Sequence, residues 1–183
     1  MLKDRLKKQA LGLLLVHNKR IVSFLPSATE TLCALGVGRQ VVGVTHECKF
    51  PPDARRKPRV IHSSFDPERL SSNQIDIKIS EIMQSGGDIY VVDDVALNKA
   101  KPDLIVAQGL CQVCSPFTKE IDRALAVLSK KPEVLILDPH DLDDILANIV
   151  TIAGKVGRSG RGLKLVSSLR KRINAISATI GME

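Results

Sequence analysis

The sequence predicts an α/β fold: a doubly wound, mainly parallel sheet with helices on both faces, followed by a long amphipathic helix. Short runs of β-branched and apolar residues alternate along the chain with longer stretches of helical periodicity. The expected strands are apolar almost throughout, as in parallel strands that are covered on both faces. With 183 residues, 44% of them hydrophobic and 26% charged, the chain is long enough for one well-buried core.

The expected strands and helices alternate from residue 20 to residue 155. The strands are expected at Ile21–Leu25, Gln40–Thr45, Val60–Ser63, Leu104–Gln108 and Val134–Asp138. The helices are expected at Ser27–Gly36, Pro67–Ser85, Asp94–Ala100, Pro116–Ser129 and Leu142–Lys155. Pro26 ends the first strand and Ser27 can cap the helix that follows, while Gly86 and Gly87 end the second helix.

The sequence divides into three parts. We expect a basic helical extension at residues 1–19, an α/β ligand-binding lobe at residues 20–155 and a long helix at residues 159–181. Apolar residues recur in the last helix at spacings of three and four, at Leu163, Val166, Leu169, Ile173, Ile176 and Ile180. This stripe must fold back on the sheet or cover something outside the chain, and the sequence leaves both options open.

The net charge of +7 is confined to the two ends of the chain. Residues 1–20 hold six Lys and Arg against one acid, and residues 155–183 hold seven against one, whereas residues 21–154 are mildly acidic. Such terminal charges usually solvate helix faces, and anionic partners are the alternative. Only 3% of the residues are aromatic, so a surface that stacks bases is hard to build and a nucleic-acid partner is disfavoured.

The N-terminal segment only partly resembles a secretory signal. The apolar run Ala10–Val16 follows several lysines, but His17 comes directly after it where small residues would mark a cleavage site. The sequence also lacks the roughly 18 consecutive apolar residues of a membrane span. We therefore expect a cytoplasmic location, with a periplasmic or extracellular-facing one as the alternative. In the cytoplasm, the four cysteines would be thiols or ligands.

Several segments, taken in order, resemble the cobalamin-binding, periplasmic-binding-protein-like family. They are the segments RIVSFLPSATE (20–30), LCALG (32–36), VGVTHECKFPP (42–52), KPDLI (101–105) and LCQVC (110–114). The resemblance covers about residues 20–145. It implies a clamshell of two α/β lobes joined by a rigid helix, which holds cobalamin or an iron chelate and delivers it to a membrane transporter subunit rather than acting as an enzyme.

A complete member of that family would continue into a second lobe, whereas this chain stops at Glu183. One lobe presents only one face of the cleft, and a tightly binding site buries most of its ligand. The expected partners are therefore a homodimer mate that docks through the terminal helix or a separately encoded second lobe. A third explanation for the single lobe is that the sequence is a piece of a longer protein that was cut at the terminal helix.

The expected ligand site lies outside the carboxyl ends of the parallel strands. Loops at these ends carry Pro26 and Ser27, then His46, Glu47 and Cys48, and then the segment from Leu110 to Cys114. The resemblance assigns ligand contacts to the same loops. The expected ligand-binding residues are Pro26, Ser27, His46, Glu47, Cys48, Leu110, Cys111 and Cys114.

The pair Cys111 and Cys114 admits three interpretations. The cysteines can pack as small buried residues, or they can contact the metal of a bound corrin, heme or other chelate. In the third interpretation they hold a metal ion together with His46 and Cys48, which would supply four ligands. The alternative function is therefore a metal- or thiol-dependent sensor or interaction module.

Other residues receive weaker assignments. The sequence contains neither a nucleophile elbow nor a phosphate-binding loop nor a spaced carboxylate pair, so an enzyme is not expected. His62 lacks a matching partner in sequence and is expected to be a surface or hydrogen-bonded residue. Members of the family dock on their transporter through an exposed acid on each lobe; Asp93, Asp94 and Glu68 are the candidates here.

Overall fold

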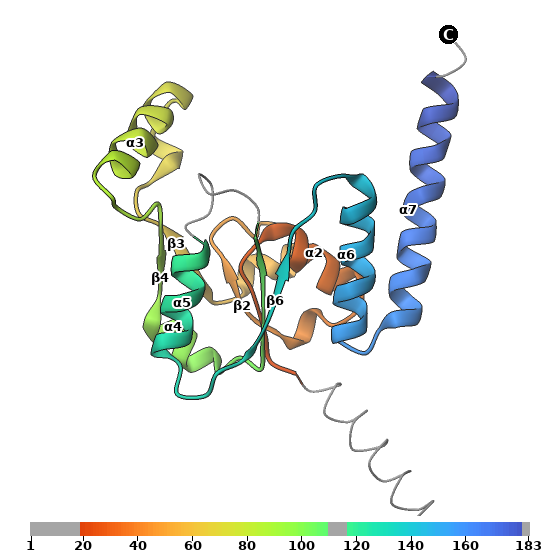
Figure 1. Cartoon of the computed structure of the whole chain (residues 1–183), viewed down its shortest axis with the longest axis horizontal. Coiled ribbons are helices and arrows are strands. Elements are labelled where there is room, and N and C mark those ends of the chain that lie inside the picture. The colour runs from red at the N-terminus through yellow and green to blue at the C-terminus, as the bar shows by residue number, and fades with distance from the viewer. Residues whose placement is uncertain (1–18, 110–116, 181–183) are drawn as a thin grey trace, which may run out of the picture.

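The computed structural model describes residues 19–109 and 117–180. Its centre is a sheet with the strand order β4-β3-β2-β1-β5-β6 (Figure 1). Neighbouring strands are parallel, except that β3 and β4 are antiparallel. The strands are β1 (Ile21–Ser23), β2 (Val41–Thr45), β3 (Arg59–Ser63), β4 (Tyr90–Val92), β5 (Leu104–Gln108) and β6 (Glu133–Leu137). The mainly parallel sheet predicted from the sequence is confirmed.

Helices cover both faces of the sheet, as expected for a doubly wound fold. On one face, Leu32 of α2 and Ile152 of α6 share a buried cluster. On the other face, Leu97 of α4 and Ala124 of α5 share a second cluster. The helices are α2 (Pro26–Ala34), α3 (Ser72–Gln84), α4 (Asp94–Ala100), α5 (Phe117–Val127), α6 (Leu142–Lys155) and α7 (Ser159–Ile180), with short 3-10 turns η1 (Gly38–Gln40), η2 (Pro52–Arg56) and η3 (Pro67–Arg69).

Successive apolar side chains of the strands belong alternately to the two clusters. In β1, Ile21 belongs to the cluster under α2 and α6, and Val22 belongs to the one under α4 and α5. In β5, Leu104 and Val106 join the first cluster, whereas Ile105 joins the second. Successive side chains of a strand point to opposite faces, so a strand that is buried on both faces is apolar at most positions.

The first helix begins differently from the prediction. Leu25 occupies the N-cap position and Pro26 is the first helical residue, so Ser27 lies within the first turn and is not the cap. Proline suits this place because its fixed φ matches the helix and its missing N–H would be unpaired there anyway. The predicted Ser27 cap is therefore wrong.

The predicted helix from Pro67 to Ser85 is divided. It starts as η3 and then restarts as α3, because Ser71 forms a capping box with Gln74. The Gln74 N–H donates to Ser71 Oγ (3.4 Å) and the Ser71 N–H donates to Gln74 Oε1 (2.9 Å). These bonds pair the N–H groups that a helix start leaves free, and they fix the start of α3 after residue 71.

The terminal helix α7 packs on α6 along its first half and then extends beyond it (Figure 1). Gly162 permits the close approach, since an added Cβ would lie 2.4 Å from the Ala153 Cβ. Residues 174–179 are all exposed, and Ile176 is 61% exposed. Among the helices that the structure describes, none has both the length and the apolarity that crossing a bilayer requires.

Candidate ligand-binding site

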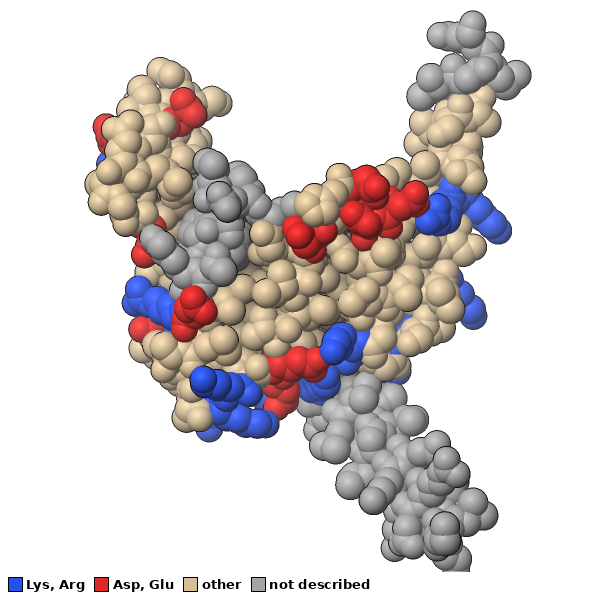
Figure 2. Space-filling view, in the orientation of Figure 1, with Lys and Arg blue, Asp and Glu red and all other residues tan. Residues whose placement is uncertain are grey.

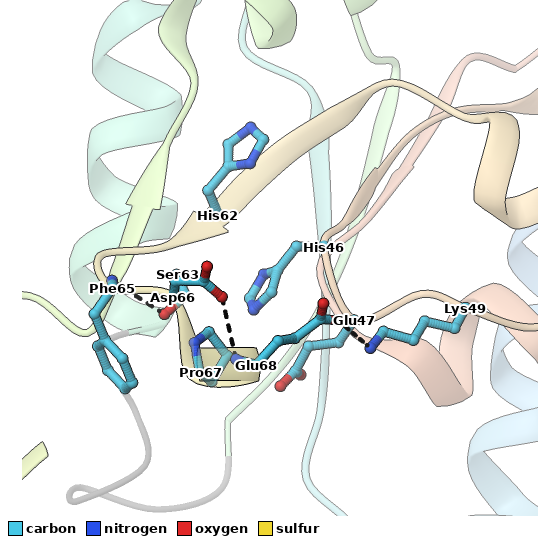
Figure 3. Close-up of a pocket in the computed structure, with 9 residues that line it drawn as sticks. All are labelled: His46, Glu47, Lys49, His62, Ser63, Phe65, Asp66, Pro67 and Glu68. Atoms are coloured by element: carbon cyan, nitrogen blue, oxygen red, sulfur yellow. Dashed lines mark hydrogen bonds and ion pairs between the residues drawn. The ribbon is translucent and has the colours of Figure 1, made fainter. Parts of the chain in front are cut away.

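A hollow of about 500 Å³ lies at the carboxyl ends of β2 and β3 (Figure 3). One wall is formed by the end of β3 and by the residues that follow β2. The other wall is formed by the segment that leads from β3 into η3. The lining residues are His46, Glu47, Lys49, His62, Ser63, Phe65, Asp66, Pro67 and Glu68. The carboxyl edge of a parallel sheet is where ligands bind in open α/β folds, so this hollow, the His46 pocket, is the candidate site.

His46 is fixed at the end of β2. Its main-chain N–H donates to the carbonyl of Ile61 on β3 (3.0 Å). Its ring lies 5.8 Å from the ring of Tyr90, centre to centre, with the planes inclined by 45°. Figure 3 shows the His46 ring pointing toward the Phe65–Glu68 wall, whereas the His62 ring points away from it.

Burial lowers the pKa of His46, and this effect exceeds the opposite influence of the neighbouring Glu47 carboxylate. Desolvation disfavours the charged imidazolium and so favours the neutral ring. A neutral imidazole keeps a nitrogen lone pair, which is what a metal centre binds. His46 can therefore act as a donor to a metal-containing ligand.

Charged groups line the rim of the His46 pocket. Lys49 Nζ lies 3.1 Å from Glu68 Oε1, which links the two walls. Asp66 Oδ1 accepts from the Glu68 N–H (3.1 Å), and Arg69 Nε lies 3.0 Å from Asp66 Oδ2. Both groups of the Lys49–Glu68 pair are well exposed, so this ion pair can open at little cost.

The structure places Cys48 away from the rim. Its side chain is completely buried, and Sγ lies 3.2 Å from Thr29 Oγ1 and 3.4 Å from Thr45 Oγ1. The main-chain N–H of Cys48 donates to the Thr45 carbonyl (3.2 Å), and the resulting turn directs the thiol into the core. Glu47 is among the residues that line the pocket, whereas the Cys48 thiol does not meet His46 there.

The expected metal set is not assembled by the described part of the chain. Cys111 and Cys114, together with Leu110, lie outside the described residues, and the Cys48 thiol is in the core. Within residues 19–109 and 117–180, no group of three or more His, Cys, Asp or Glu side chains is arranged to hold a metal ion.

Ser27 lies at a second, smaller hollow further along the same edge. This hollow of about 220 Å³ is bordered by α2, the ends of β5 and β6, and α6. Its lining residues are mostly apolar and comprise Leu25, Ser27, Thr31, Gln108, Leu137, Pro139, Ile145, Asn148, Ile149 and Ile152. Pro26 adjoins Ser27 at the start of α2. The rim expected as one site thus consists of a polar pocket and an apolar hollow.

Sequence reasoning missed the second wall of the His46 pocket. Phe65, Asp66, Pro67 and Glu68 follow β3 directly, so the rule applied to the other parallel strands would have found them. His62, expected only as a surface or hydrogen-bonded residue, also lines the pocket, where its Nε2 lies 3.8 Å from Asp93 Oδ2.

Comparison with known proteins identifies the family. Residues 21–182 match the family model described as periplasmic binding protein. A curated relative, the uncharacterized ABC transporter substrate-binding lipoprotein YvrC of Bacillus subtilis (strain 168), is 36% identical over 62 residues, which is 34% of this chain and 20% of that protein.

Solved structures share the fold at low identity. The periplasmic heme-binding protein BhuT in complex with two hemes matches with a TM-score of 0.63 and 20% identity, over 90% of this chain and 51% of that one. The periplasmic vitamin B12 binding protein BtuF of Vibrio cholerae matches with a TM-score of 0.56 and 22% identity, over 88% and 50%. The chain thus spans about half the length of these solved relatives.

These findings correct the expected cytoplasmic location. The matching family is that of periplasmic binding proteins, and the curated relative is a lipoprotein, so both point to an outward-facing location. The family model matches most of the chain, including the sheet, the His46 pocket and α7. The chain therefore belongs to the periplasmic binding protein family.

Proposed function

We propose that this chain is a ligand-capturing lobe that binds a metal-containing macrocycle or chelate in the His46 pocket, for import through a membrane transporter. The observation that carries the proposal is the pocket itself. It has a volume of about 500 Å³, lies at the carboxyl edge of the sheet and contains a histidine whose pKa is lowered by burial. Solved relatives named for heme and for vitamin B12 support this class of ligand.

The chemistry of the pocket suits a ligand that combines a metal with an apolar frame. The neutral His46 ring can donate to the metal, while Phe65 and Pro67 offer apolar surface to the frame. Lys49 can approach a carboxylate of the ligand if its exposed ion pair with Glu68 opens. Pro26 and Ser27, near the apolar hollow, remain proposed ligand contacts. Leu110, Cys111 and Cys114, which lie outside the described residues, also remain proposed contacts.

The pocket is open, so this lobe leaves part of the ligand uncovered. A site that binds tightly buries most of its ligand, which requires a second surface opposite the carboxyl edge. Because the chain spans about half of its solved relatives, a second lobe is the proposed source of that surface. The acid that contacts the transporter would be Glu68, Asp93 or Asp94.

The proposal is tested by titrating the purified chain with hemin and, separately, with cyanocobalamin, followed by visible absorption. We expect saturable binding of at least one ligand, with a spectral change that His46→Ala removes. His140→Ala is the matched control, because His140 lies beyond β6 and outside the His46 pocket. The proposal fails if the chain binds neither ligand, or if His46→Ala and His140→Ala both bind like the parent chain.

A further inference from the structure

The segment of residues 65–88, here called the arm, leaves the sheet and returns to its starting point. Strands β3 and β4 are antiparallel, with Ser63 paired to Tyr90. The Ser64 N–H donates to the Ile89 carbonyl (2.8 Å), which closes the base of the arm. Two residues could therefore join these strands as a tight hairpin, and the arm is not needed to connect them.

The arm contributes little to the core. None of the α3 residues, all of which are described, is buried. Among described residues, both buried clusters are formed from outside the arm. Ile75, Ile79 and Ile82 form a stripe with helical spacing, but they are only partly buried.

Local interactions build the arm as a defined unit. The capping box of Ser71 and Gln74 starts α3, and Gly86, with a φ of +70°, ends it. The Gly87 N–H donates to the Ile82 carbonyl (2.9 Å), and the Gly86 N–H donates to the Met83 carbonyl (3.1 Å), as in a Schellman motif. A helix of 13 residues is marginal in water without packing, so these caps help to keep α3 formed.

The base of the arm is also one wall of the His46 pocket. Phe65, Asp66, Pro67 and Glu68 belong to the arm, whereas His46 and the rest of the lining belong to the sheet side. The exposed Lys49–Glu68 ion pair bridges the two sides. Figures 1 and 2 show the arm and α7 rising on either side of the carboxyl edge.

We infer that the arm is a ligand-covering wall, and that the bound macrocycle lies between the His46 imidazole and the arm, with Phe65 against its apolar face. The inference rests on the proposed function. It adds that the arm is the part of the chain that sets affinity and selectivity for the ligand. The arm is not needed to connect β3 to β4, its helix α3 is capped at both ends, and its base forms part of the pocket. Its role therefore lies in contact with the ligand, and planar ligands with apolar faces are the class that Phe65 can stack on.

The test replaces residues 65–88 of the full chain with an Asn-Gly turn and compares hemin and cyanocobalamin affinities with those of the parent chain. We expect an unchanged cooperative unfolding of the sheet and a Kd about tenfold or more higher for the ligand that the parent binds. Equal Kd values would overturn the inference while leaving the proposed function intact. Absence of binding by the parent chain would instead remove the proposed function, and this inference with it.

Point variants of the full chain provide a second test that does not depend on folding of the shortened chain. Phe65→Ala should raise the Kd several-fold, whereas Ile77→Ala should leave it unchanged. Ile77 is 49% exposed on α3 and lies outside the pocket lining, which makes it a matched control on the same arm. Equal effects of the two substitutions on the Kd would contradict a specific role for the arm in ligand contact.

Discussion

The sheet body, which comprises the six strands and the helices α2, α4, α5 and α6, differs from the arm in what holds it together. The strands and the helices α2, α4, α5 and α6 share two buried clusters, in which side chains such as Leu32 and Ile105 are fully covered. The arm instead relies on helix caps and partial burial, although it forms one wall of the pocket. Stability and ligand contact are therefore carried by different residues, and each can be changed separately.

The largest expected effect contrasts one residue of each region. Leu32→Ala should lower the free energy of unfolding by about 3–4 kcal/mol, since it leaves a cavity under α2. Ile77→Ala on the arm should change it by less than about 0.5 kcal/mol, because that side chain is already half exposed. Urea unfolding followed by circular dichroism measures both free energies of unfolding. Comparable losses would contradict the assignment of stability to the sheet body rather than to the arm.

Two glycines of the sheet body, Gly43 and Gly154, test how tightly it is packed. An added Cβ at Gly43 would lie 2.7 Å from Val60 Cγ1 and 3.2 Å from Val22 Cγ2. Gly43→Ala should therefore destabilise the chain by about 1–3 kcal/mol through overpacking. At Gly154 an added Cβ would meet no described atom within 4 Å, so Gly154→Ala on α6 should stabilise it by roughly 0.5–1 kcal/mol. Unfolding midpoints that rise for both variants would show that the contact at Gly43 is relieved, and midpoints that fall for both would contradict the expected gain at Gly154.

Ser71→Ala tests the local stability of the arm. Loss of the capping bond should destabilise α3 by about 1 kcal/mol and leave the global unfolding midpoint unchanged. Hydrogen exchange should then quicken in residues 72–84 alone. If the global midpoint fell with it, the arm would be coupled to the body more tightly than the burial pattern indicates.

The smallest expected effect concerns pH. The pKa of His46 is lower in the folded protein than in the unfolded chain, so the unfolded chain binds more protons between the two values. Stability should therefore decrease slightly as the pH falls through about 6.5 toward the folded-state pKa. An NMR titration of the His46 ring should give a midpoint below about 6.5, and a higher midpoint would exclude desolvation as the dominant influence.

Local signals in the sequence predict most of the sheet. Helix α6 and strand β5 match their predicted bounds because a capping Asp141 and a continuous apolar run define them locally. Strand β4 was missed because it has only three residues and forms by pairing with β3, a partner far away in sequence. No short-range pattern encodes such a pairing.

The site was predicted less completely than the fold. The position of His46 follows from the carboxyl end of β2, which the apolar pattern locates. The orientation of Cys48 depends on a turn and on Thr29, which is brought in by α2, so its place in sequence could not reveal that the thiol is buried. The arm wall likewise depends on where β3 and β4 pair.

The central claim is that ligand binds in the His46 pocket, between the sheet and the arm. The most direct test is amide hydrogen exchange of the full chain with and without saturating hemin, resolved by peptide. We expect slower exchange in residues 46–49 and 62–68 and little change in residues 142–152 beside the apolar hollow. Protection confined to residues 142–152 would place the ligand in the apolar hollow and contradict the account.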